Sequence, residues 1–307
     1  MPIYFPSTIK DEVICYFTIM ILVKQAEQKA KKIFNSIFNI DTWEYELENL
    51  HGFDLQMINK AKEKVKEGLA LLDNFDMVVK KGHDFYPKRL TKVQNAPPFL
   101  FLRGEPMLAN RTVVSIVGTR NPSIEGQKRA RVLSKLLSER GIIIASGLAA
   151  GIDTAAHYGT FDAKKPTIAV LGTPLNKTYP KSNFRLQNEI GKTGLLVSQF
   201  LPGLPIQRWN FPLRNAVMSG ISIATIVMEA GETSGALIQA REALKQGRKV
   251  FIPKSAVENP NLKWPKKYIK RPGASMFSTL SDLLDQLDNN NLLNEYQTEQ
   301  KNQLITI

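Results

Sequence analysis

Six short apolar runs, separated by helical segments, constrain most strongly what this chain can fold into. The runs cover 113–118, 142–147, 167–172, 195–200, 223–230 and 249–253. Each run is continuously apolar rather than alternating, which is typical of a parallel strand buried on both faces. Segments such as "GQKRARVLSKLLSERG" and "GALIQAREALKQG" supply helices between them. The pattern predicts an α/β fold, a doubly wound, Rossmann-like parallel sheet spanning 105–287.

The ends of the chain have a different pattern. Between Lys24 and Leu72, apolar residues recur three and four positions apart with charges between them, which predicts a small helical module over 1–82. We expect an extended linker over 83–104 that docks on the core, because its prolines disfavour helix. Polar, Asn- and Gln-rich sequence predicts a disordered tail over 288–307.

Charge narrows the class of partner. Lys and Arg number 41 against 28 acidic residues, a net charge of +13 in 307 residues. Nucleic acid, anionic membrane and phosphorylated ligands are the usual partners of such a field. The apolar run 13–23 is well short of the roughly 20 residues that cross a bilayer, so we expect a buried helix or strand, no membrane partner and a cytoplasmic protein. One cysteine, Cys15, and three scattered histidines predict no disulfide and no metal site.

The turns after the strands are where a ligand is expected, since open parallel sheets bind ligands beyond the carboxyl ends of their strands. The first turn is Gly118-Thr119-Arg120 and the second contains Ser146-Gly147. Arg120 stands where the dinucleotide motif needs its second glycine, and no P-loop sequence is present, so we expect no cofactor. Helix N-terminal N–H groups and an arginine fork form a general phosphate site, which makes Arg120 the predicted anchor.

Two residues near the second turn have competing interpretations. Asp153 could cap the following helix or act as a catalytic base, and we favour the cap. His157 has no acid and nucleophile partner in the sequence, so we expect a structural role.

Cations and aromatic residues alternate near the ends of two strands. Single-stranded nucleic acid requires both, cations for its phosphates and aromatic faces for its unstacked bases. A basic stretch over 253–273 adds further cations. The residues concerned are Tyr179, Lys181, Arg185, Arg208, Trp209, Phe211, Arg214 and Lys254.

An ordered set of motifs makes the chain resemble the DNA-processing protein A family (DprA, also called Smf) over most of 84–285. They are "DFYPKRL", "PPFLFLRGE", "SIVGTR", "SGLAAGID", "VLGTPLNKTYPKSN", "FPLRN", "EAGETSGALIQAREALKQGRKVF" and a late "GA". The resemblance implies that the N-terminal helices correspond to the family's sterile-alpha-motif-like module. It also implies a non-catalytic protein that binds single-stranded DNA, forms a homodimer and helps to load a RecA-type recombinase in natural transformation.

The resemblance also assigns residues to DNA. Carried over by motif, the arginine of the family's DNA-binding pocket is Arg120 and the lysine of its "YPK" motif is Lys181. The residues of its "FPxRN" motif are Phe211, Arg214 and Asn215. The predicted DNA-binding set is therefore Gly118, Thr119, Arg120, Ser146, Gly147, Lys181, Phe211, Arg214, Asn215 and Lys254.

The chain departs from the family at three places. Ala216 replaces an arginine of the usual "FPxRNR", and Lys254 follows Pro253 where the family has glycine. The stretch before the late "GA" is also atypical, which puts the dimer in doubt. Two other functions therefore stay open: a Rossmann-like nucleotide sensor or nucleoside-phosphate hydrolase with Glu229 as its acid, and a DprA-like accessory in defence against foreign DNA.

Overall fold

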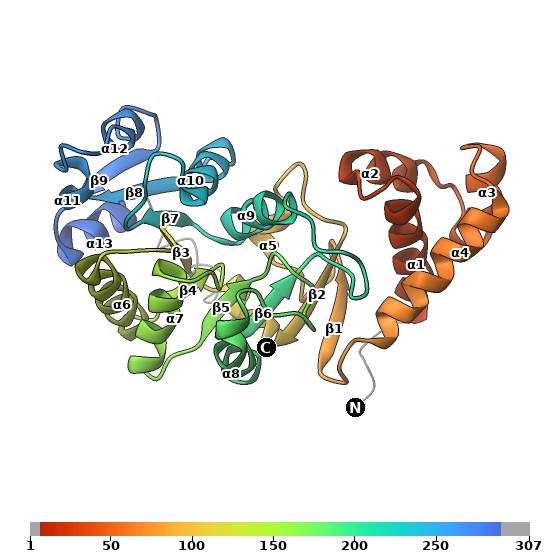
Figure 1. Ribbon diagram of the computed structural model, residues 1–307, viewed down its shortest axis with the longest axis horizontal. Helices are drawn as coiled ribbons and strands as arrows, with labels where there is room; N and C mark the ends of the chain where they lie inside the picture. Colours follow the sequence, from red (N-terminus) through yellow and green to blue (C-terminus); the bar gives the residue numbers. More distant parts are fainter. Residues whose placement is uncertain (1–6, 290–307) are drawn as a thin grey trace, which may run out of the picture.

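The computed structural model describes residues 7–289, and one nine-stranded sheet runs through them (Figure 1). The strand order is β1-β2-β6-β5-β4-β3-β7-β8-β9. All pairs within β3 to β9 are parallel. The chain winds outward from β3 in both directions, which confirms the predicted doubly wound, Rossmann-like fold. The strands are β1 (Asp76–Lys80), β2 (Phe99–Gly104), β3 (Val113–Val117), β4 (Ile143–Ser146), β5 (Thr167–Val170), β6 (Leu195–Ser198), β7 (Ala224–Val227), β8 (Lys249–Pro253) and β9 (Ala274–Phe277).

Helices cover both faces of the sheet, which explains the continuous apolar runs. In β3, Val113 and Val117 face one core while Val114 and Ile116 face the other, and all four are buried. One face carries α6 (Ile124–Glu139), α7 (Ile152–Asp162), α8 (Phe184–Thr193) and α13 (Leu280–Asn289). The other carries α5 (Lys88–Thr91), α9 (Asn210–Ile221), α10 (Gly235–Lys245), α11 (Lys254–Val257) and α12 (Trp264–Tyr268). Short 3-10 turns are η1 (Ile40–Thr42), η2 (Pro106–Asn110) and η3 (Lys181–Asn183).

The N-terminal helices pack on one end of the sheet (Figure 1). Phe17 of the first helix meets Phe101 of β2, with ring centroids 5.5 Å apart. The run 13–23 thus lies mostly in a buried helix, as predicted, and within 7–289 no helix has the length and apolar character to cross a membrane. These helices are α1 (Ser7–Leu22), α2 (Glu27–Ser36), α3 (Trp43–Asn49) and α4 (Leu55–Ala70).

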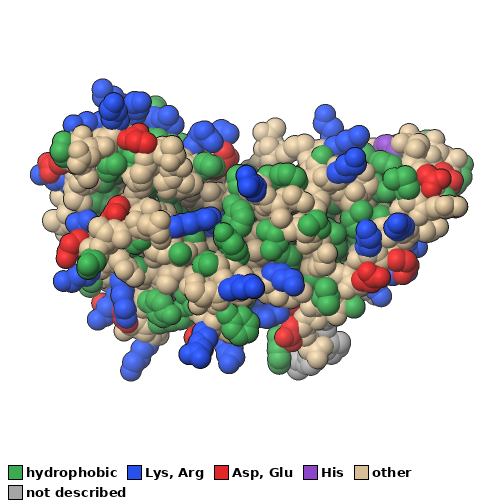
Figure 2. Space-filling model, in the orientation of Figure 1, with side chains coloured by type: hydrophobic (Ala, Val, Ile, Leu, Met, Phe, Trp, Pro, Cys, Tyr) green, Lys and Arg blue, Asp and Glu red, His purple; other side chains and the backbone are tan. Residues whose placement is uncertain are grey.

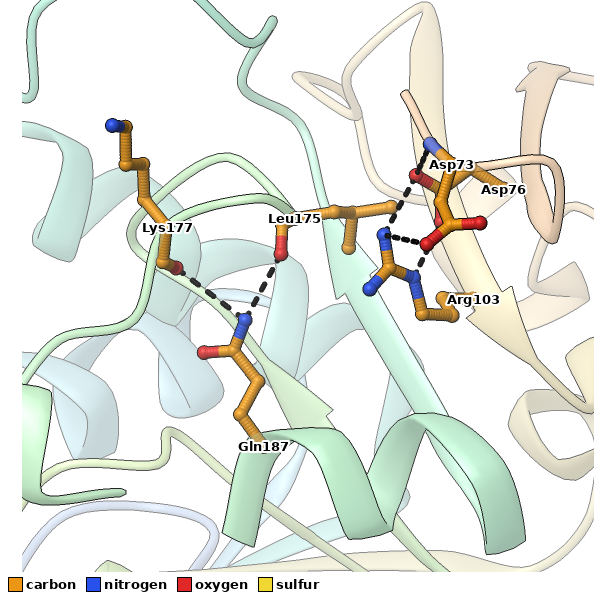
Figure 3. A network of polar contacts seen from close by, with 6 residues as sticks. All are labelled: Asp73, Asp76, Arg103, Leu175, Lys177 and Gln187. Atoms are coloured by element: carbon orange, nitrogen blue, oxygen red, sulfur yellow. Dashed lines mark hydrogen bonds and ion pairs between the residues drawn. The ribbon is translucent and has the colours of Figure 1, made fainter. Parts of the chain in front are cut away.

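Two strands, β1 and β2, fall where the sequence predicted a helical module and a linker. They pair antiparallel with each other, and β2 also pairs antiparallel with β6. Arg103 donates from Nε to Oδ1 of Asp76 at 2.6 Å and from Nη2 to Oδ2 at 2.9 Å (Figure 3). Sequence periodicity missed these strands because β2 pairs with β6, about a hundred residues away, and β1 joins the sheet only through β2. The predicted tail lies outside the described residues from 290 onward.

Candidate nucleic-acid interface

A pocket opens at the point where the winding of the sheet reverses. There β3 and β7 lie side by side, although more than 100 residues separate them in the chain. Their carboxyl ends, together with α9 and the N-terminus of α10, enclose a volume of about 410 Å³. Doubly wound sheets bind their ligands at this topological position. The pocket is lined by six of the ten residues predicted to bind DNA: Gly118, Thr119, Arg120, Phe211, Arg214 and Asn215.

The first turn is fixed by Glu229, which follows β7. Its backbone carbonyl accepts a hydrogen bond from Thr119 N at 2.6 Å. Its carboxylate accepts from Ser123 N at 2.9 Å and from Ser123 Oγ at 2.7 Å. Ser123 in turn caps α6 by accepting from Gly126 N. The carboxylate that could have served as an acid in a hydrolase therefore holds the turn that presents Arg120.

Arg120 lies beside two neighbouring aromatic rings at the rim of the pocket. Its guanidinium carbon is 5.8 Å from the ring centroid of Tyr179 and 5.8 Å from that of Phe211. The two rings are themselves 5.4 Å apart. Arg120 is exposed, and Tyr179 is 50% exposed. Three segments far apart in the chain thus bring one cation and two ring faces together, as binding of single strands requires.

Beneath this rim lies Arg214, which the sequence predicted as a contact to DNA. It is only 6% exposed and donates from Nη1 to the carbonyl of Val170 at 3.0 Å. Burial lowers the pKa of Arg214, and neighbouring Asp153 partly opposes that change. A side chain this enclosed shapes the pocket floor and offers only part of its guanidinium to a ligand.

Asp153 and His157 are structural, although Asp153 is not the helix cap that the sequence suggested. Gly151 precedes α7 as its N-cap, and the Asp153 carboxylate instead accepts from Gly147 N at 3.1 Å and Ala149 N at 3.4 Å. Burial raises the pKa of Asp153, while Arg214 lowers it. His157 is fully buried and shares a hydrogen bond with Thr167, and burial lowers its pKa to about 3. The cap prediction failed because α7 begins at Ile152, which places Asp153 inside the helix, where its carboxylate reaches back to the loop N–H groups.

Four predicted residues lie outside the pocket lining. Ser146 is buried and donates to the carbonyl of Ile116, and Gly147 lies under the Arg214 guanidinium. Lys181 is exposed in η3, close along the chain to Tyr179. Lys254 begins α11, pairs with Glu258 at 3.5 Å and borders a separate hollow between α6 and β9. The pocket therefore does not unite all the predicted cations.

The sequence did not predict that the basic stretch over 253–273 is held close to the pocket. The Glu232 carboxylate, beside the pocket, accepts hydrogen bonds from Lys263 N at 2.6 Å and Trp264 N at 3.0 Å. These bonds hold the pKa of Glu232 below its ordinary value. They anchor α12, over which lysine and arginine side chains gather in Figure 2. A short-range signal could not reveal this link because the acid and the basic stretch are 31 residues apart.

Comparisons with known proteins identify the family of the chain. The sequence model described as "DNA recombination-mediator protein A" matches residues 77–288. The chain is 36% identical to DNA processing protein DprA of Bacillus subtilis over 208 residues, covering 67% of this chain and 70% of that protein. It is 37% identical to Protein Smf of Escherichia coli over 205 residues, covering 66% of this chain and 54% of the relative.

Solved structures extend the likeness to the whole fold. The X-ray structure of DprA from Streptococcus pneumoniae superposes with a TM-score of 0.67 at 29% identity, covering 93% of this chain and 98% of that one. DprA from Helicobacter pylori superposes with a TM-score of 0.62 at 22% identity, covering 70% of this chain and 96% of that one. The sequence match spans well over half of the chain, and this chain therefore belongs to the DNA recombination-mediator protein A family.

Proposed function

We propose that this chain binds single-stranded DNA without sequence preference, at the pocket and rim beyond β3 and β7, and acts as a recombination mediator. The observation that carries the proposal is the position of Arg120 beside the rings of Tyr179 and Phe211. A guanidinium pairs with a phosphate, and the adjacent ring faces stack with bases of any identity.

Electrostatics support the same ligand. The net charge is +13, and two cations close in sequence to the aromatic rings, Lys181 and Arg208, are exposed. The carboxylates of the neighbouring acids already accept hydrogen bonds. Glu229 accepts from Ser123, and Glu232 accepts from backbone N–H groups at the start of α12. A phosphate backbone approaching the rim therefore meets exposed cations rather than unpaired carboxylates.

The same contacts support a protein that acts without catalysis. The titratable groups in and below the pocket already have structural partners. Asp153 holds loop N–H groups, Glu229 caps α6 through Ser123, and His157 is enclosed beside Thr167. A nucleophile, a base and an orienting group would have to stand within hydrogen-bond reach of one another, and the described pocket lining does not supply that set.

Family membership extends the proposal to partners. A recombination mediator hands single-stranded DNA to a RecA-type recombinase, and we include that recombinase, a homodimer and a cytoplasmic location in the proposal. The Helicobacter pylori structure of this fold is described as binding single-stranded DNA. Recombinase loading is checked by following RecA filament formation on strands coated with single-strand-binding protein, with and without this chain.

The direct test is fluorescence anisotropy of labelled oligonucleotides, single-stranded and duplex, across a salt series. We expect tighter binding of single strands, with an affinity that falls linearly with the logarithm of salt concentration. Equal or absent binding of the two forms would contradict the proposal. A panel of free nucleotides, scored by thermal stabilisation, tests the alternative of a nucleotide sensor, because selective binding to the native state raises its stability.

A further inference from the structure

Trp209 differs from the other two tryptophans of the chain in its exposure. The others are 5% and 2% exposed, whereas Trp209 is 48% exposed. It directly precedes α9 and lies two residues before Phe211, yet it does not line the pocket of the candidate interface. Instead it lines a small hollow together with Gln25 and Glu27, at the turn into α2. An exposed indole at the junction of two parts of a protein is typical of a surface that binds a partner.

The small hollow adjoins a larger groove, because Leu213, Glu27 and Pro97 line both. The groove has a volume of about 680 Å³ and is formed by α9, the end of α10, residues 92–97 and the start of α2. Its lining shares no residue with that of the pocket beyond β3 and β7. We call it the α9 groove, and it is a second site on the opposite side of Trp209 from Phe211 along the chain.

Positive charge exceeds negative charge in the α9 groove. Both carboxylates of its lining are paired with a lysine. The pairs are Glu27 with Lys31, and Glu242 with Lys245 at 3.1 Å. Lys92, which is exposed, and Arg248 add two further positive charges to the lining. A groove with this balance of charge suits the phosphates of a nucleic acid.

The first residues of α9 connect the groove with the rim of the pocket. Arg208 and Trp209 precede the helix and are both exposed, Phe211 lies beside Arg120 at the rim, and Leu213 lines the groove. Alternating cations and ring faces are what successive nucleotides of a single strand require. Continuity with the rim therefore favours nucleic acid over a peptide as the ligand of the groove.

We propose that a bound single strand continues from the rim across Trp209 and into the α9 groove, so that the N-terminal helices form part of the DNA-binding surface. This inference rests on the proposed function, because the strand is the one held at Arg120. The rim then holds only a few nucleotides, and a longer strand gains further contacts at Trp209 and in the groove. These contacts are independent of sequence, since every base has a face that stacks and a phosphate that pairs with lysine.

Intrinsic tryptophan fluorescence tests this path, since a base that stacks on an indole quenches its emission. The strands are thymidine oligonucleotides of about 4 and about 16 nucleotides, which span the site sizes of single-strand-binding domains. We expect the long strand to quench the emission of the wild-type protein and the short strand to quench it little. Trp209→Phe keeps a ring at the site, so it should bind both strands with nearly wild-type affinity and lose the quenching. Absence of quenching by the long strand, or quenching that persists in Trp209→Phe, overturns the inference.

Lys92→Ala tests the groove itself. We expect it to reduce the log–log salt slope of the long strand by about 0.7 and to leave that of the short strand unchanged. The control is Lys165→Ala, because Lys165 is an exposed lysine just before β5, at the opposite edge of the sheet from the rim, and it should change neither slope. A wild-type slope for the long strand in Lys92→Ala overturns the inference and leaves the groove to another class of ligand, such as a peptide. Failure of the wild-type protein to bind either strand would instead contradict the proposed function.

Discussion

The guanidinium of Arg214 occupies the space that a side chain on Gly147 would need. A Cβ placed on Gly147 would lie 1.4 Å from Nη1 of Arg214. The second turn therefore needs a glycine at this position because the buried arginine leaves no room for a Cβ, rather than because a ligand approaches the backbone there.

Gly147→Ala tests that relationship. We expect the substitution to displace Arg214 and to lower the free energy of unfolding by about 2 kcal/mol or more, as overpacking of an enclosed site does. Urea denaturation measures the change. Gly235→Ala is the control, because its Cβ would have open space, and it should alter stability by less than about 1 kcal/mol. Equal effects of the two substitutions would refute the account of Gly147.

Arg103→Met tests the junction between β1 and β2. It leaves the Asp76 carboxylate, whose side chain is fully buried, without its bidentate partner. We expect a loss of about 3–5 kcal/mol, because an uncompensated buried charge remains. The control is Arg131→Met, which removes an equally bidentate pair with Asp162 whose side chains are 51% and 36% exposed. That change should cost less than about 1 kcal/mol, and similar losses for both would show that burial of the pair is irrelevant.

Because His157 is buried, we expect the free energy of unfolding to depend on pH. Burial lowers its pKa in the folded protein to about 3, against an ordinary value of 6.5. Between these values the unfolded chain binds a proton that the folded chain does not, so stability falls as pH drops through that window. One such group contributes up to about 1.4 kcal/mol per pH unit. The difference in unfolding free energy between wild type and His157→Gln, followed by urea titration from pH 7 to pH 4, should shrink by that slope, and a constant difference would exclude a neutral His157.

The sequence predicted the parallel sheet well, and six of the ten residues that it assigned to DNA line one pocket, while their binding of DNA stays a prediction. Burial on both faces leaves continuous apolar runs, so β3 to β8 could be located from the sequence. The meeting of Arg120 with Phe211 could not, since it depends on strand order rather than on spacing. Arg214 was predicted to contact DNA because cations and aromatic residues alternate around it and because the "FPxRN" motif assigns it, yet packing encloses most of its side chain. Lys254 is exposed, as predicted for a residue that binds DNA, but the fold places it at a different hollow, between α6 and β9.

The most direct test of the account is the salt dependence of single-strand binding by Arg120→Ala and Arg120→Lys, measured by fluorescence anisotropy. Arg140→Ala serves as the control, because Arg140 is an exposed arginine that follows α6, at the far end of that helix from the pocket. We expect Arg120→Ala to weaken binding and to reduce the log–log salt slope by about 0.7. Arg120→Lys should retain the slope but bind less tightly than wild type, since lysine lacks the planar group that lies against Tyr179 and Phe211. Wild-type affinity and slope in a folded Arg120→Ala protein would contradict the account.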